Sequence, residues 1–311
     1  MLEFSHKPVM LEECMEGLAL KEGGLYFDGT VGGGGHSFEI LKRTKTGKLI
    51  ATDLDDEAIE AANKRLAAFA DRYTIYKSNY KDFARVFDEA GIESVDGALL
   101  DFGISSHQID DEERGFSYRM ADAPLDMRMD RTSFLTAEYI LNTYPEDKLA
   151  KILKTYGEET FAKQIARNVV KYREDKPLKT SGEFSEIIRN SIPAKFRYGA
   201  PCERKSFQAL RIEVNGELDC LYELVVSLTK RIKKGGRMVI LTFQSLEDRI
   251  VKEAFRELES PCTCPGNFPV CVCGKKAQVK IITKKPITAS EEELNDNSRS
   301  KCAKLRIAER I

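Results

Sequence analysis

The stretch Leu25-Tyr-Phe-Asp28-Gly-Thr-Val-Gly32-Gly-Gly-Gly35-His36-Ser-Phe38 combines three features of a nucleotide-binding corner. Its first three residues form the apolar end of a predicted buried strand, which Asp28 closes. Four consecutive glycines follow, and they tolerate positive φ and let a ligand approach the bare backbone. His36 and Ser37 then open a helix. A strand, a glycine turn and a helix in this order predict a doubly wound α/β fold.

A second acidic strand end follows at the spacing that such a corner requires. Lys48-Leu-Ile-Ala-Thr-Asp53 predicts the next parallel strand. Asp53 lies 18 residues after Gly35, close to the spacing at which a carboxylate receives the two hydroxyls of a ribose. The alternative is a plain glycine loop, with Asp53 only capping the helix that begins near Asp55. The combination of turn, helix, strand and terminal acid favours nucleoside binding.

The glycine pattern distinguishes two classes of nucleoside cofactor. Nicotinamide-dependent oxidoreductases usually carry Gly-x-Gly-x-x-Gly beside a pyrophosphate. Here Asp28 precedes the glycines, so the pattern resembles the Asp/Glu-x-Gly-x-Gly-x-Gly motif of class I methyltransferases, which bind S-adenosylmethionine. Gly32 and Gly34 match the last two glycines, whereas Thr30 replaces the first. S-adenosylmethionine carries a sulfonium cation instead of phosphate, and the charge of Asp28 suits it. A nicotinamide-dependent oxidoreductase stays as the alternative.

Composition and charge limit the class of protein. The chain has 311 residues, of which 42% are hydrophobic and 32% charged, as in soluble globular proteins. It shows neither an apolar run of membrane-spanning length nor a signal peptide, so we expect a cytoplasmic location and no membrane partner. Net charge is −1, but residues 148–205 hold 14 Lys/Arg and 7 Asp/Glu. This local excess favours a basic face for a polyanion, with ordinary solvated helices as the alternative.

Two further residues lie at predicted strand ends. Val95-Asp-Gly-Ala-Leu-Leu-Asp101 predicts a central strand, and a doubly wound fold presents its chemistry at the carboxyl end of such a strand. Asp101 is therefore a candidate acceptor for a target amine, although this chain lacks the Pro-Pro pair that amino-group methyltransferases often carry there. Its alternative role is to cap the next turn. Tyr80 follows the predicted strand that begins at Tyr73, where an aromatic ring flanks an adenine or covers the sheet edge.

Several stretches resemble one family from end to end of the chain. They are His6-Lys-Pro-Val-Met, Asp28-Gly-Thr-Val-Gly-Gly-Gly-Gly-His-Ser, Leu99-Leu-Asp-Phe-Gly-Ile-Ser-Ser-His-Gln-Ile-Asp, Glu113-Arg-Gly-Phe-Ser-Tyr, Ala123-Pro-Leu-Asp-Met-Arg-Met-Asp, Ser206-Phe-Gln-Ala-Leu-Arg-Ile-Glu-Val-Asn and Lys304-Leu-Arg-Ile-Ala-Glu. Together they resemble the bacterial small-subunit ribosomal RNA methyltransferase H family. Members of that family methylate the N4 amino group of a cytosine near the ribosomal P site.

The resemblance implies a methyl donor, an RNA partner and a set of contact residues. The residues expected to contact S-adenosylmethionine are Gly34, Gly35, His36, Asp53, Tyr80, Asp101 and Gln108. Tyr80 stands where other members have Phe, and His107 stands where Pro is common. The implied substrate is 16S ribosomal RNA, expected in an assembled particle, although naked RNA stays open, as does the oligomeric state. The alternatives are methylation of another RNA amino group and RNA binding without methyl transfer.

The resemblance and the helical patterns also predict the domain organisation. We expect a Rossmann-like, class I methyltransferase core built from residues 1–106 and 207–311. Between them, residues 107–206 are expected to form a helical insertion, with helices near 136–142, 146–156, 159–173 and 182–191. Because the basic excess lies largely in this insertion, we assign it to RNA docking. After Lys233-Lys-Gly-Gly, taken as a helix stop, residues 237–243 predict the fifth strand.

Four cysteines form a compact cluster near the end of the chain. Cys262, Cys264, Cys271 and Cys273 make two Cys-x-Cys pairs within twelve residues, half of the eight cysteines present. Four thiolates so close together are able to bind structural zinc. The usual spacing is Cys-x-x-Cys, so the sequence leaves open whether the cluster binds zinc or is an unliganded loop.

Overall fold

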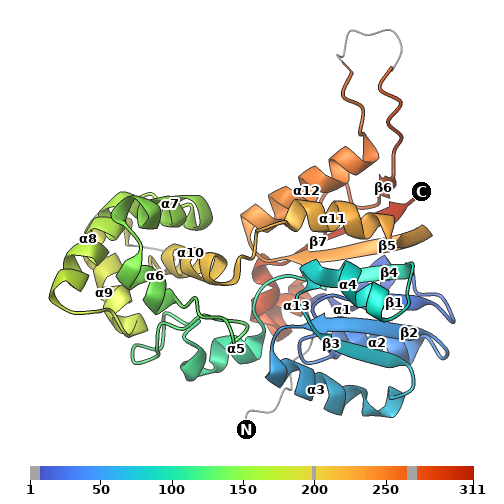
Figure 1. Ribbon diagram of the computed structural model, residues 1–311, viewed down its shortest axis with the longest axis horizontal. Coiled ribbons are helices and arrows are strands. Elements are labelled where there is room, and N and C mark those ends of the chain that lie inside the picture. Colours follow the sequence, from blue (N-terminus) through green and yellow to red (C-terminus); the bar gives the residue numbers. More distant parts are fainter. Residues whose placement is uncertain (1–7, 198–200, 265–271) are drawn as a thin grey trace. The chain divides into compact units, whose positions relative to one another are not determined.

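The computed structural model describes residues 8–197, 201–264 and 272–311. It divides into two compact units, each with its own hydrophobic core (Figure 1). The first contains the described residues up to Gly103 together with Cys220–Ile311, and the second is Ile104–Asp219. In the described residues, no helix combines the length and the apolar character needed to cross a membrane.

A seven-stranded sheet in the order β3-β2-β1-β4-β5-β7-β6 forms the centre of the first unit. The strands are β1 (Leu25–Asp28), β2 (Lys48–Asp53), β3 (Tyr73–Lys77), β4 (Val95–Asp101), β5 (Ile232–Thr242), β6 (Val279–Ile281) and β7 (Lys304–Arg310). Strands β1 to β5 are parallel, whereas β7 runs antiparallel to both β5 and β6. The predicted doubly wound α/β sheet is confirmed. Its strand order reverses between β1 and β4, which is where such sheets bind ligands.

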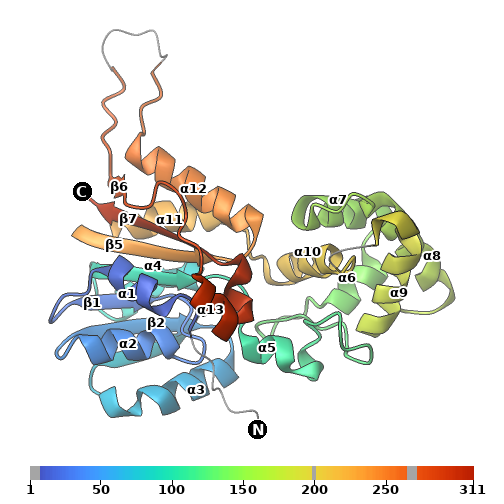
Figure 2. The same ribbon diagram turned by 180° about the vertical axis from the view of Figure 1, so that it is seen from behind.

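Helices cover both faces of this sheet (Figures 1 and 2). One face carries α1 (Leu11–Leu18), α2 (Gly35–Arg43) and α3 (Asp56–Leu66), and the other carries α4 (Phe83–Glu89), α11 (Leu221–Lys230) and α12 (Ser245–Glu259). Successive residues of β1 face opposite layers. Tyr26 joins the core beneath α1 and α2, while the Phe27 ring packs edge-on against Phe87 of α4 at 5.1 Å. Burial on both faces explains the continuous apolar runs of the central strands.

The beginning of β5 corrects one expectation. Lys233-Lys-Gly-Gly was expected to stop a helix, but α11 already ends at Lys230 and β5 begins at Ile232. Ile232 pairs with Val95, and the next paired residue, Arg237, lies opposite Gly97. Residues 233–236 therefore bulge out of the ladder. The bulge forms because Ile232, whose side chain is buried, pairs with Val95. The strand therefore begins before the two glycines.

The second unit is helical, and all four helices expected in it are present. They are α6 (Ala137–Thr143), α7 (Glu146–Gly157), α8 (Ala162–Asp175) and α9 (Ser181–Ser191), preceded by the short α5 (Ser106–Asp110) and followed by α10 (Arg204–Asn215). Helix α10 differs from the expectation, because residues from 207 onwards were assigned to the methyltransferase core. Its Phe207, Leu210 and Val214 instead join the core of the helical unit. It also passes close to α7, since a Cβ on Gly157 would lie 2.5 Å from the Lys205 carbonyl oxygen.

Candidate nucleoside-binding site at the switch of strand order

Three carboxylates lie at the carboxyl ends of neighbouring strands. Asp28 ends β1, Asp53 ends β2 and Asp101 ends β4. The turn after β1 is bonded to all three strand ends. The Thr30 amide donates to Asp28 Oδ1 at 3.1 Å, the Gly32 amide donates to Asp53 Oδ2 at 2.8 Å, and the Asp101 amide donates to Thr30 Oγ1 at 2.7 Å. The structure thus brings Asp53 and Asp101 together around the glycine turn.

Thr30 was the residue that departed from the methyltransferase glycine motif, and the structure gives it a role. Its hydroxyl oxygen joins the turn to β4 through the Asp101 amide. A glycine in its place has no such acceptor. The sequence carries no signal for this role, because the Asp101 amide lies 71 residues further along the chain.

The predicted contacts Gly34 and Gly35 lie where the turn enters α2. Gly34 caps the helix with φ of 75°, and a Cβ there would lie 3.1 Å from the Ala62 Cα atom, so both backbone conformation and space require glycine. A Cβ on Gly35 would lie 2.3 Å from Pro8 Cγ. The segment before α1 therefore packs directly on the glycine turn, which explains the Pro-Val part of the N-terminal motif. His6 in the same motif lies outside the described residues.

His36 is buried and neutral. Burial lowers its pKa to about 4. Its Nε2 lies 3.1 Å from the Val9 carbonyl oxygen, which only accepts, so Nε2 carries the proton and Nδ1 is the acceptor. Nδ1 lies 3.9 Å from Asp101 Oδ2. Because the imidazole is uncharged, this contact is not an ion pair, and His36 does not neutralise Asp101.

Asp101 holds a carboxyl oxygen that has no hydrogen-bond partner within the described structure. About a quarter of its side chain is exposed, but Oδ1 is enclosed and unpaired. Burial, together with the charges of Asp28 and Glu247, raises the pKa of Asp101 to about 8. An enclosed oxygen without a partner is costly, so the site is prepared for a ligand that supplies a positive charge or a hydrogen.

The other two acids are already engaged within the protein. The Ser37 hydroxyl donates to Asp28 Oδ2 at 2.6 Å, and burial raises the pKa of Asp28 to about 6. Asp28 is only 1% exposed, so it acts on a positively charged ligand through its field and not by direct contact. Burial also raises the pKa of Asp53, whose Oδ1 accepts from the Asp55 amide at 3.0 Å. Each Asp53 oxygen keeps a further lone pair for a ligand hydroxyl.

Tyr80 and Gln108 complete the predicted set. Tyr80 begins a short 3₁₀ turn after β3, and its ring lies 5.3 Å from that of Phe102, which follows β4. It therefore stands at the same carboxyl edge of the sheet as the acids. Gln108 belongs to the helical unit, where its Oε1 accepts from the Ser105 amide at 3.0 Å and closes the cap of α5. The structure thus brings together the predicted contacts that belong to the first unit, whereas Gln108 is part of the second unit.

The polar groups of the turn disfavour a phosphate. The Gly32 amide is bonded to Asp53, and the Gly34 amide donates to the Val31 carbonyl oxygen at 2.8 Å. These two amides are therefore occupied within the protein, and the negative charges of Asp28 and Asp53 repel an anion at the same place. The site instead suits a nucleoside that carries positive charge, which argues against the pyrophosphate of a nicotinamide dinucleotide.

The raised pKa of Asp101 predicts a pH-dependent stability. Between pH 3.8 and about 8 the folded protein retains a proton that the unfolded chain has lost. The contribution of Asp101 to stability is therefore complete in acid and is lost as the pH rises through this window. Relative to wild type, Asp101→Asn should gain stability between pH 5 and pH 9, by at least about 1 kcal/mol. Urea unfolding at several pH values, with the exposed Asp71→Asn as control, measures this difference. A difference that stays constant with pH would contradict a protonated Asp101.

Comparison with known proteins identifies the family. The model of the MraW methylase family matches residues 3–311. Curated relatives named ribosomal RNA small subunit methyltransferase H include those of Lachnospira eligens and Clostridium botulinum strain Kyoto, each 52% identical to this chain, and that of Carboxydothermus hydrogenoformans, 50% identical. Each alignment covers 100% of this chain and at least 99% of the relative. With its glycine turn, its three acidic strand ends and this match over the full length, the chain belongs to the MraW methylase family.

Proposed function

We propose that this protein is an S-adenosylmethionine-dependent methyltransferase that acts on the N4 amino group of a cytidine in small-subunit ribosomal RNA, in the cytoplasm and on an assembled particle. Full-length relatives that carry the name of such an enzyme support the ribosomal RNA substrate. The observation that carries the proposal is that Asp28, Asp53 and Asp101 lie around one turn. The amides of this turn already donate hydrogen bonds within the protein. Membership of a methylase family removes the oxidoreductase alternative.

The residues at the carboxyl edge fit the parts of this donor. Asp53 has lone pairs for the ribose hydroxyls, residues 34–36 line the methionine end, and Tyr80 offers a ring to the adenine. Asp101 accepts from the positively charged end of the donor. S-adenosylmethionine supplies a methyl group activated by its sulfonium charge.

Asp101 also links donor binding to the target amine. The N4 lone pair of cytosine is delocalised into the ring, so acceptors for the amino hydrogens raise its nucleophilicity. A protonated Asp101 is a poorer acceptor than its carboxylate. A nearby cation lowers the pKa of a carboxyl group, so the positive charge of the donor ionises Asp101. The donor-bound protein is therefore the form prepared to orient an amine, which favours donor binding before RNA.

The exposed helix surface of the second unit suits RNA docking. Lys163, Arg167 and Lys171 of α8 are spaced four residues apart, so they share one helical face, and all three are exposed. The opposite face of α8, with Ile165 and Val169, is buried in the helical core. A helix held by its apolar face and presenting three cations outward matches the phosphate backbone of RNA.

Asp53→Ala should weaken the binding of S-adenosylmethionine by roughly 1–3 kcal/mol, because it removes the ribose acceptor. It also removes the acceptor of the Gly32 amide, so a second ligand is needed to separate the two effects. A donor analogue without ribose hydroxyls should lose much less affinity in the variant, when both are measured by calorimetry. Asp56→Ala, which changes an exposed acid on α3, is the matched control. Equal losses for both ligands would mean that Asp53 acts only through the turn.

Reversing the charges of Lys163, Arg167 and Lys171 to Glu should weaken RNA binding. The slope of the logarithm of the binding constant against the logarithm of the salt concentration should become smaller in magnitude by roughly two to three. Donor affinity should not change. The control reverses three exposed lysines of the first unit, Lys42, Lys45 and Lys48. Binding titrations of small-subunit RNA at several salt concentrations compare the variants. Normal RNA affinity in the α8 variant would place docking on another surface.

The product should be N4-methylcytidine. Methylation at cytosine C5 normally requires a cysteine that adds to the ring, whereas an exocyclic amine needs only orientation and acceptors. Residues 101–108 at the end of β4 contain no cysteine. Mass spectrometry of nucleosides from treated small-subunit particles identifies the product, and a Cys202→Ser, Cys220→Ser double variant should keep full activity. Detection of 5-methylcytidine, or of an RNA adduct that requires either cysteine, would contradict this mechanism.

A further inference from the structure

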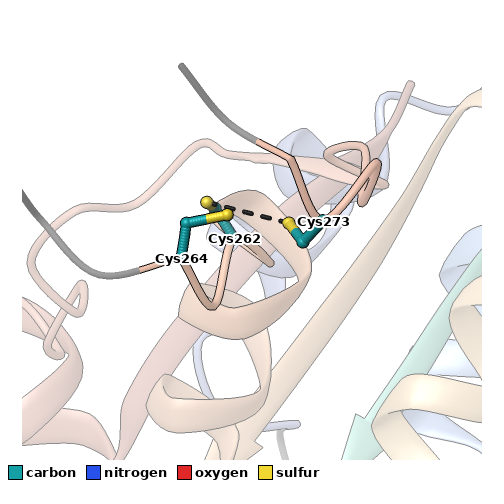
Figure 3. Close-up of side chains that lie close together, drawn as sticks. All are labelled: Cys262, Cys264 and Cys273. Atoms are coloured by element: carbon teal, nitrogen blue, oxygen red, sulfur yellow. Dashed lines mark hydrogen bonds between the residues drawn. The ribbon is translucent and has the colours of Figure 1, made fainter. Parts of the chain in front are cut away.

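Three thiols meet in the loop between α12 and β6. Cys262 and Cys264 come from the first Cys-x-Cys pair and Cys273 from the second (Figure 3). Their sulfur atoms all lie within 4.8 Å of one another, and the Sγ atoms of Cys262 and Cys273 are 3.8 Å apart. Cys271, the remaining member of the second pair, lies outside the described residues, so the inference rests on the other three.

The spacing of the sulfur atoms fits a metal ion better than a disulfide. Ligands at about 2.3 Å from a tetrahedral zinc ion lie about 3.8 Å from one another. A disulfide needs sulfurs about 2.05 Å apart and joins only two of them. The Cys273 thiol is placed to donate to Cys262, but a thiol is a weak donor and a weak acceptor. That contact is therefore weak, whereas thiolates bind a zinc ion strongly.

The described residues of this loop do not belong to an apolar core. Of the described residues from 260 to 278, none is buried, and the Val272 side chain is 73% exposed. At the base of the loop the Gln278 amide donates to the Leu258 carbonyl oxygen at 2.8 Å. A long loop whose side chains are not buried needs another source of stability. In small domains a bound metal ion supplies it.

The backbone around the thiols also suits thiolate ligands. Cys262 and Cys264 are two residues apart, so an extended chain directs both side chains to the same side. The Val272 amide donates to Cys264 Sγ at 3.4 Å, and such bonds strengthen when the sulfur is charged. Gly274, directly after Cys273, has φ of 65°, which lets the chain turn back.

We propose that Cys262, Cys264 and Cys273 bind a structural zinc ion. Each thiol releases a proton to solvent when it binds the metal, and the ion takes the place of a core in this loop. Four thiolate or imidazole ligands are usual in structural sites, so a fourth donor completes the coordination. The bound metal fixes the chain that leads to the exposed Lys275 and Lys276, and it takes no part in methyl transfer.

The test measures metal directly and does not depend on activity. The full-length protein, purified under reducing conditions after growth with added zinc, should contain about one zinc ion per chain by elemental analysis. The triple variant Cys262→Ser, Cys264→Ser, Cys273→Ser should contain roughly tenfold less. Cys220→Ser, an exposed cysteine on another element, is the matched control and should keep the wild-type content.

Two further measurements distinguish a zinc site from its alternatives. Cobalt added to the apoprotein should give the intense thiolate-to-metal absorption of tetrahedral sulfur coordination, and this absorption should be missing in the triple variant. Protease cleavage between residues 260 and 278 should become faster when a chelator removes the metal from the wild-type protein. Equal zinc in wild type and triple variant, iron in place of zinc, or a disulfide within the cluster of the reduced protein would each overturn the proposal.

Discussion

Three carboxyl groups buried at neighbouring strand ends are the constraint on which the first unit depends. Asp28, Asp53 and Asp101 are brought together by the parallel order of β1, β2 and β4, and burial raises the pKa of each of them. Two of the three are stabilised by hydrogen bonds from the turn and from Ser37. The third, Asp101, keeps one oxygen that has no hydrogen-bond partner among the described residues. The fold thus carries a local cost that a cationic ligand relieves, which is how a binding site differs from a core.

The second unit uses the remaining family motifs for structure. Arg114, only 1% exposed, donates to the carbonyl oxygens of Arg128 and Met129. Asn215 at the end of α10 accepts from the Met129 amide at 2.7 Å and donates to the Met127 carbonyl oxygen at 2.8 Å. Arg114 and Asn215 lie far apart in the sequence, and both therefore hold the loop at residues 127–129. This explains why residues up to 219 belong to the helical unit.

The sequence predicted the sheet well because its strands carry strong local signals. The predicted bounds of β2 and β4 match the structure, since each is an apolar run closed by an acid. The bulge at 233–236 and the placement of α10 were not predictable in this way, because both depend on partners distant in the chain. Among the site residues, the glycines and acids were visible from spacing. The roles of Thr30, Ser37 and the segment at Pro8 were not, because they arise only when the turn meets other strands and the segment before α1.

The position of β7 has a consequence for how the protein is made. In the sheet β7 lies between β5 and β6, although β6 precedes it in the chain. As a ribosome synthesises the chain, β6 has no strand to pair with until β7 has emerged. The edge of β5 that later pairs with β7 stays unpaired for the same time. Leu305 and Ile307 of β7 also supply buried side chains beneath α1. The half of the sheet that holds Asp28, Asp53 and Asp101 is synthesised early, so we expect it to require protection from aggregation until the antiparallel strand closes the other half.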